Sequence, residues 1–188
     1  MRISEQHRLI TVVDVFDKLF NKPYRTCLIG GAEEPLYKPA AHSDQLHRLF
    51  FREDYLSSAL HEVAHWSIAG PHRLLKQDYG YWYRPDGRSS HEQRLFEKVE
   101  VKPQALEWMF SIACGHDFSI SLDNLNGSGR DDADSRLLFR RAISNQCINW
   151  CKSEKLPARA YQFIQGLMEA FSTPDPCDAR LYQLTATG

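Results

Sequence analysis

The sequence predicts a single α+β domain in which a small sheet packs against several helices. Apolar residues recur at helical spacing in several long segments of the chain. Short apolar runs next to glycine or proline lie between the first and the second of these segments, and they predict strands. With 188 residues, of which 43% are hydrophobic, the chain can bury one sizeable core. We therefore expect residues 1–188 to form one domain.

The N-terminal part of the chain predicts one helix and three strands. Ser4 can cap a helix that runs to about Phe20, because apolar side chains recur along one side of this segment. Residues 25–29, 35–39 and 46–51 form short apolar runs near turn-forming residues, which predicts three strands. The second run begins and ends with proline, so we expect it at an edge of the sheet.

The next helix should begin near Leu56, and it contains the motif H-E-x-x-H. Residues spaced by three and four predict a stripe that faces the core, formed by Leu56, Ala59, Leu60, Val63 and Ser67. Gly70, which precedes a proline, should end the helix in a left-handed conformation. Residues four apart lie on the same face of a helix, so His61 and His65 can offer imidazole nitrogens to one metal ion.

The helix expected over about residues 89–113 can supply a third ligand. Four of its polar residues are spaced by three or four and share one face, namely Glu97, Glu100, Gln104 and Glu107. In gluzincin-type sites a glutamate one helix after the motif binds the metal. Glu100 is the preferred ligand here, and Glu97 is the alternative. We expect Pro103 to interrupt this helix and to turn the carboxylate of Glu100 toward the histidines.

Two histidines and a carboxylate suit more than one metal and more than one chemistry. His72 is a further candidate ligand, at a spacing from His61 one residue longer than in metzincins. With zinc, Glu62 would be the general base of a hydrolase, either a peptidase or an endoribonuclease. With ferrous iron, open positions would bind dioxygen and substrate, and Glu62 would hold a substrate ammonium or orient a ligand. A binding module with a structural metal is a third reading.

Composition restricts the partners and the location of the chain. A formal net charge of −1 and a pI near 6.7 disfavour a stable nucleic-acid complex and an anionic membrane surface. The chain has no apolar run of about 18 residues, and Met1–Arg8 is too polar for a signal peptide, so we expect a cytoplasmic protein. The five cysteines contain no C-x-x-C pair, which predicts free thiols.

The remaining segments are expected to be architectural. Residues 79–88 predict an aromatic strand that ends in a Pro-Asp-Gly turn. A helix from Asp131 to about residue 152 should bury Leu138, Phe139, Ala142, Ile143, Cys147 and Trp150. A last helix should begin after Pro157 and bury one apolar face. The tail from about residue 172 contains two prolines, and we expect it to be extended or mobile.

Three strings of the sequence together resemble the bacterial elongation factor P hydroxylase family. They are residues 57–70, which contain the H-E-x-x-H motif, residues 79–83, which read YGYWY, and residues 96–108. The likeness extends over most of the chain. It implies an enzyme that hydroxylates the modified lysine of elongation factor P after a β-lysyl group has been attached. It also implies a fold similar to single-metal bacterial endoribonucleases and zincins.

The same resemblance implies a non-haem metal held by two histidines and one carboxylate. In this chain, Fe(II) would be bound by His61, His65 and Glu100, with dioxygen as co-substrate, and zinc or another divalent metal can occupy such a site as purified. The partner would be elongation factor P. The positive charge of its modified lysine would be oriented by Glu62, by Glu97 or by the aspartates at 131–132.

Overall fold

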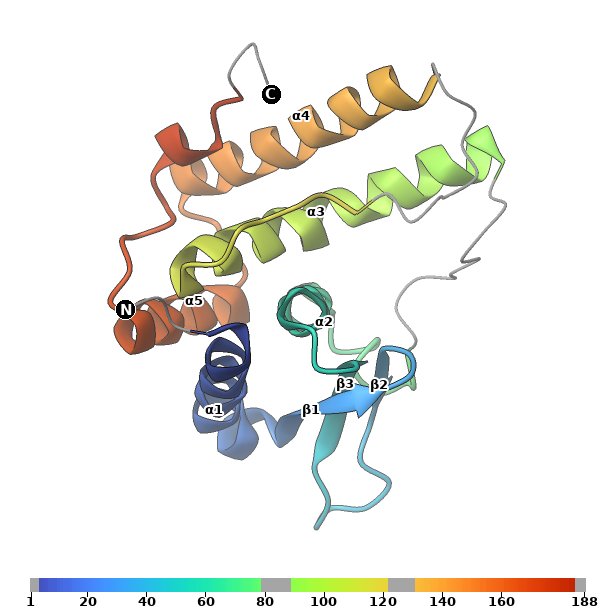
Figure 1. Ribbon diagram of the computed structural model, residues 1–188. Helices are drawn as coiled ribbons and strands as arrows, with labels where there is room; N and C mark the ends of the chain where they lie inside the picture. Colours follow the sequence, from blue (N-terminus) through green and yellow to red (C-terminus); the bar gives the residue numbers. More distant parts are fainter. Residues whose placement is uncertain (1–3, 79–88, 122–130, 185–188) are drawn as a thin grey trace.

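The computed structural model describes residues 4–78, 89–121 and 131–184, which form one small α+β domain with five helices and a three-stranded sheet (Figure 1). Helix α2 (Leu56–Ile68) lies at its centre. The sheet and α1 (Glu5–Tyr24) lie on one side of α2, and α3 (Ser90–Cys114) lies on the other, followed by α4 (Asp131–Ser153) (Figure 1). The central helix packs against α1, α3, β3 (His47–Arg52) and α5 (Ala158–Phe171).

Helix α1 begins as predicted and ends later. The hydroxyl of Ser4 accepts a hydrogen bond from the backbone N–H of His7, which satisfies one free donor of the first turn. The helix continues to Tyr24 because its last turn tolerates Pro23, and it stops where Arg25 turns left-handed (φ 50°). The N–H of Arg25 then donates to the carbonyl of Phe20.

The sheet contains β1 (Thr26–Ala32), β2 (Leu36–Lys38) and β3 (His47–Arg52) in the order β1-β3-β2. β1 is parallel to β3 and β2 is antiparallel to it, so the prediction that the second strand lies at an edge is confirmed. β1 continues through both glycines rather than ending at Ile29. A Cβ on Gly30 would lie 2.7 Å from the Phe51 ring, and Gly31 has φ 77°, so this part of the strand requires glycine.

The predicted core stripe of α2 is confirmed, but its expected end is wrong. All five stripe residues are buried. The helix ends at Ile68, Ala69 is extended, and Gly70 is not left-handed. A side chain from α5 (Ala158–Phe171) caps it instead: the Arg159 guanidinium donates to the carbonyls of Ser67 and Ala69. The same guanidinium lies 4.5 Å from the Trp66 ring centroid. This tertiary cap makes a left-handed glycine unnecessary.

Helix α3 is continuous, so the predicted interruption at Pro103 is wrong. A capping box between Ser89 and Glu92 fixes its start, and a left-handed Gly115 (φ 68°) ends it. Proline removes one hydrogen bond from the middle of a helix. The turn after Pro103 is nevertheless held by tertiary packing, because Ala105, Leu106, Met109 and Phe110 are all fully buried.

The C-terminal helices cover α3, with one correction. Phe139, Ile143, Cys147 and Trp150 of α4 are buried as predicted, whereas Leu138 is 64% exposed. An α-helix with 3.6 residues per turn cannot place two adjacent residues equally inward, and Phe139 occupies the core position. In α5, the apolar face of Ala160, Phe163, Ile164 and Leu167 is buried.

The tail is less extended than the sequence predicts. It contains a short 3-10 helix, Ala179–Tyr182, and the ring of Tyr182 is fully buried. The Tyr182 hydroxyl donates to the carbonyl of Pro176 over 2.6 Å, and the Ser144 hydroxyl donates to the carbonyl of Tyr182 over 2.6 Å. A buried tyrosine with a satisfied hydroxyl anchors this segment to α4.

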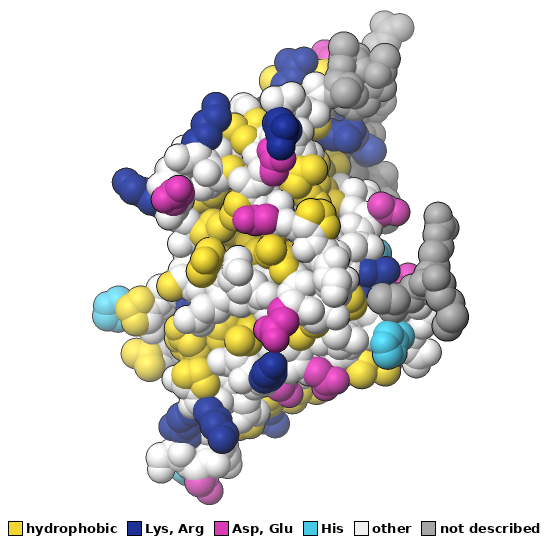
Figure 2. All heavy atoms as spheres, turned by 90° about the vertical axis from the view of Figure 1, so that its left-hand side faces the viewer, with side chains coloured by type: hydrophobic (Ala, Val, Ile, Leu, Met, Phe, Trp, Pro, Cys, Tyr) yellow, Lys and Arg dark blue, Asp and Glu magenta, His cyan; other side chains and the backbone are white. Residues whose placement is uncertain are grey.

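The surface carries no strong electrostatic signature on the face toward α1 and α5, where basic and acidic side chains are interspersed among apolar ones (Figure 2). None of the helices that the structure describes is both long and apolar enough to span a bilayer. The five cysteines are free thiols, as predicted. The aromatic strand predicted at 79–88 lies outside the described residues.

We predict that Arg159→Met destabilises the protein by about 1–3 kcal/mol, the usual contribution of charge-assisted hydrogen bonds to backbone carbonyls. Methionine keeps the apolar stem over Trp66 but removes the donors that cap α2. Urea unfolding of both proteins measures the difference in free energy. The matched control is Lys155→Met, at an exposed position, which should change stability by less than about 0.5 kcal/mol. Equal stability of the two variants would refute the capping role.

Candidate metal centre

Two helices meet at a cluster of imidazoles and a carboxylate. His61 and His65 project from α2 toward α3, and Glu100 projects from α3 toward them. One ligand atom from each of these residues lies within 4.8 Å of the other two. The Nε2 atoms of the two histidines are 3.0 Å apart. Glu100 reaches both rings, with Oε1 3.2 Å from Nε2 of His65 and Oε2 3.4 Å from Nε2 of His61.

A second glutamate holds His61 from behind. Glu107 lies seven residues after Glu100 on the same face of α3, and its Oε2 is 2.8 Å from Nδ1 of His61. Because a carboxylate accepts, Nδ1 carries the proton of this hydrogen bond. In the neutral ring that a metal ion would bind, Nε2 is then unprotonated and its lone pair points at the cluster. The side chain of Glu107 is 9% exposed and that of His61 is 24% exposed, so water reaches this contact mainly from the side of the histidine.

The cluster concentrates negative charge in the interior, because Glu62, Glu100 and Glu107 are all buried. Burial alone would lower the pKa of His61, but the hydrogen bond to Glu107 and the charges of nearby glutamates raise it to about 10. Burial would raise the pKa of Glu100, yet the hydrogen bond from His65 and the charges of both histidines hold it below its usual value. The site therefore favours a positive charge among its carboxylates.

The donor set fits a single metal ion. Ligand atoms that bind one ion at about 2.1 Å, with angles between 90° and 109°, are about 3.0–3.4 Å apart. The nitrogen–nitrogen distance of 3.0 Å and the nitrogen–oxygen distances of 3.2 and 3.4 Å all match. In addition, Oε2 of Glu100 is buried and accepts no hydrogen bond among the described residues. Such an oxygen is costly to bury unless a cation neutralises it.

The other residues that the sequence singles out lie apart from this cluster. Glu97 faces α4, because its Oε1 accepts from Ser135 of that helix over 3.4 Å. The same oxygen accepts from Gln93, one turn earlier on α3, over 3.1 Å. His72 is exposed and does not join the metal-type cluster found in the described part of the chain. Gln104 exchanges two hydrogen bonds with the backbone of Ser121. The side chains at 131–132 lie outside the described residues.

The role of Glu107 is missing from the sequence prediction, although a signal for it exists. Glu107 belongs to the acidic face that also contains Glu100, and two turns of helix separate the two carboxylates. At this spacing, Glu100 can approach Nε2 of a histidine ring on the facing helix while Glu107 approaches Nδ1 of the same ring. Only the crossing of α2 and α3 shows that His61 occupies this place.

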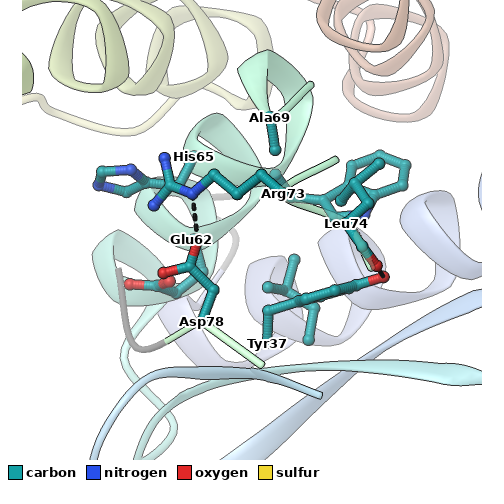
Figure 3. A pocket seen from close by; sticks show the side chains of 9 residues that line it. Tyr37, Glu62, His65, Ala69, Arg73, Leu74 and Asp78 are labelled. Carbon is teal, nitrogen blue, oxygen red and sulfur yellow. Dashed lines mark hydrogen bonds and ion pairs between the residues drawn. The ribbon is translucent and has the colours of Figure 1, made fainter. Parts of the chain in front are cut away.

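A pocket lies beside the cluster, under the C-terminal half of α2 (Figure 3). It encloses only about 20 Å³, about the room that one water molecule needs, and it is partly open to solvent. Its lining combines residues of α2, the sheet and the segment after α2, namely Tyr37, Leu49, Glu62, His65, Trp66, Ala69, Arg73, Leu74 and Asp78. His65 belongs to both the cluster and the pocket, so a molecule in the pocket lies next to the cluster. Burial in this wall raises the pKa of Glu62.

Comparison with known proteins places the chain in a family. Residues 15–181 match the family model described as elongation factor P hydroxylase. The chain is also 40% identical over 180 residues to the elongation factor P lysine hydroxylase of Haemophilus influenzae, an alignment that covers 96% of this chain and 98% of that protein. Both matches include α2 and α3 and hence all the residues of the cluster. The chain therefore belongs to the elongation factor P hydroxylase family.

Proposed function

We propose that the protein hydroxylates the β-lysyl-modified lysine of elongation factor P, with non-haem Fe(II) held by His61, His65 and Glu100 and with dioxygen as co-substrate. The observation that carries this proposal is a cluster of two histidines and one carboxylate, of which His65 and Glu100 are buried, in a chain that belongs to a hydroxylase family. This donor set is the one that non-haem iron oxygenases use, and it leaves coordination positions open. When bound, ferrous iron supplies the activation of dioxygen.

The residues of the chain prepare the site in three ways. His61, His65 and Glu100 come from helices rather than loops, which fixes their positions before the metal binds. Glu107 keeps the His61 ring in the tautomer that turns Nε2 inward. Burial of His65 and Glu100 limits the access of water on their side of the cluster, which strengthens electrostatic attraction to a cation. Glu62 lies in the wall of the adjacent pocket, at the side from which we propose that substrate approaches.

The alternative is a zinc hydrolase that uses the same helix, with Glu62 as the general base. The donor set alone permits it, and the expected likeness of the fold to single-metal endoribonucleases and zincins would agree with it. Membership of the hydroxylase family favours hydroxylation. The relative from Haemophilus influenzae is named for that activity, and its alignment with this chain covers nearly the whole length of both proteins. The two chemistries give different products, so one experiment separates them.

The test is mass measurement of the substrate protein. β-Lysylated elongation factor P is incubated with the Fe(II)-loaded enzyme and dioxygen, together with a reductant because the second oxygen atom must be reduced to water. We expect the intact mass of elongation factor P to rise by one oxygen atom. Omission of dioxygen, or replacement of iron by zinc, should prevent the gain. Cleavage of the protein or of added RNA by the zinc form would instead support the hydrolase.

We predict that His61→Ala, His65→Ala and Glu100→Gln each lose metal, whereas Glu97→Gln retains it. The first three remove proposed ligand atoms, and Glu97 contacts α4 instead. Metal affinity, measured by competition with a chelator, should fall by more than about a hundredfold for a lost ligand. This is more than the loss of a residue that only orients a ligand costs. Loss of metal in Glu97→Gln with retention in Glu100→Gln would reverse the assignment.

We predict that Glu107→Ala weakens metal binding by about 10- to 100-fold, the usual cost of removing the partner that orients a histidine ligand. Glu107→Gln should restore part of this loss, because its amide oxygen can still accept from Nδ1 of His61. Calorimetric titration with Fe(II) or Zn²⁺ measures both variants. A merely structural role would lower the melting temperature of both variants without this order in their metal affinities.

A further inference from the structure

The chain that follows α3 turns back and runs along that helix (Figure 1). Side chains on two turns of α3 hold this return segment, residues 116–121. The ring of Phe118 stacks on Trp108, with ring centroids 5.1 Å apart and an interplanar angle of 12°. One turn earlier on the helix, Gln104 exchanges two hydrogen bonds with the backbone of Ser121. The return segment is therefore fastened to α3 by a ring stack and by an amide.

The two hydrogen bonds to Ser121 fix which way the amide of Gln104 points. Its Oε1 accepts from the backbone N–H of Ser121 over 3.1 Å, and its Nε2 donates to the carbonyl of the same residue over 2.8 Å. Rotation of the amide by half a turn would set donor against donor and acceptor against acceptor, so the pairing admits one orientation. An amide nitrogen carries two protons, and the carbonyl of Ser121 takes one of them. The second N–H of Gln104 remains for another acceptor.

That acceptor is Glu100, which lies one helical turn before Gln104 on α3. Burial would raise the pKa of Glu100, but the hydrogen bond and charge of His65, the charge of His61 and a hydrogen bond from Gln104 hold it below its usual value. Glu100 is 3% exposed and Gln104 is 1% exposed, so water has little access to their contact. Gln104 thus joins the proposed metal ligand to the return segment.

We infer that Gln104 is a positioning residue of the metal centre, whose amide, fastened to the return segment, holds the carboxylate of Glu100 toward His61 and His65. This inference rests on the proposed function, in which Glu100 is a metal ligand. A glutamate side chain loses rotational freedom when it binds a metal, which costs free energy. A hydrogen bond that fixes the carboxylate beforehand reduces this cost and so raises the affinity for the metal.

A purely structural role is the alternative, in which Gln104 only fastens the return segment to α3. The two roles predict different results when the segment is loosened by other means. Phe118→Leu removes the ring that stacks on Trp108 and leaves the amide of Gln104 unchanged. If only the fastening matters, this variant should disturb the metal centre as much as a change of Gln104 does. If the contact with Glu100 matters, it should not.

The experiment measures Zn²⁺ binding by wild type, Gln104→Met and Phe118→Leu, in competition with a chelator. Methionine resembles glutamine in length and flexibility but has no N–H, so it removes the contact with Glu100 and leaves the space filled. We expect Gln104→Met to bind Zn²⁺ about 10- to 100-fold more weakly than wild type, the usual effect of losing a residue that orients a ligand. Phe118→Leu should bind Zn²⁺ as wild type does.

A spectrum of bound Co²⁺ separates the geometry of the ligands from the stability of the fold. The visible absorption of Co²⁺ depends on the number and arrangement of its ligands, so a variant that is only less stable keeps the wild-type spectrum. We expect Gln104→Met to change the spectrum, because Glu100 is no longer held toward the histidines. The spectrum of Phe118→Leu should match that of wild type.

Gln104→Asn serves as a second variant, in case Gln104→Met does not fold. Asparagine keeps a buried amide, but its side chain is one methylene group shorter and cannot reach Ser121 and Glu100 together. The Zn²⁺ affinity of this variant should also fall below that of wild type, with a changed Co²⁺ spectrum.

Two results would overturn the inference. Wild-type affinity and a wild-type spectrum in a folded Gln104 variant, or equal losses in Phe118→Leu, would leave Gln104 with a fastening role only. Glu100→Gln, measured alongside, separates this failure from a failure of the proposed metal site. If Glu100→Gln retains the metal, Glu100 is not a ligand, and the proposed site and the inference are both rejected. If Glu100→Gln loses the metal while the Gln104 variants keep it, only the inference fails.

Discussion

The contact between α2 and α3 is the interaction on which the site depends, because it brings buried carboxylates against the buried imidazole of His65 and the partly exposed imidazole of His61. Each group would be costly to bury alone, and each is stabilised by the others. Glu100 joins the two histidines, and Glu107 joins His61 from the opposite side of its ring. The anionic groups outnumber the cationic ones in this region, so the interface is built to accept a further positive charge.

An aromatic core behind α2 keeps this interface in register. The ring of Trp66 packs edge-on against Phe16 and lies 4.9 Å from the ring centroid of Phe20, both on α1. Arg159 from α5 covers another part of Trp66 and caps the end of the helix. Because close-packed interiors resist small displacements, α2 cannot rotate without disturbing these contacts. The packing of Trp66 against α1 and α5 therefore fixes the orientation of α2, and with it the positions of His61 and His65.

The sequence predicts the elements of this arrangement better than it predicts their ends. Periodicity reports which face of a helix is apolar, and so the stripe of α2 and the spacing of His61 and His65 follow from it. Helix ends depend on hydrogen-bond partners that can lie far away in the sequence, and periodicity does not reveal them. At the end of α2, the side chain of Arg159 binds the last carbonyls, so the expected left-handed Gly70 does not occur. Pro103 is tolerated for the same reason, since packing after it stabilises the turn that proline weakens. The sequence does not distinguish Glu97 from Glu100 as the ligand, because the way α3 crosses α2 decides which carboxylate faces the histidines.

The geometry of the motif itself explains why Glu62 lies beside the ligands and not among them. Successive residues of an α-helix are rotated by about 100°, so His65 lies about 60° from Glu62 around the helix axis and His61 about 100° on the same side. Glu62 therefore borders the ligand face next to His65, which is why these two residues share a pocket. The motif fixes a carboxylate at this border in any protein that uses it. What that carboxylate does depends on the opposite wall, which here combines Tyr37 and Leu49 of the sheet with the Arg73–Asp78 salt bridge of the segment after α2.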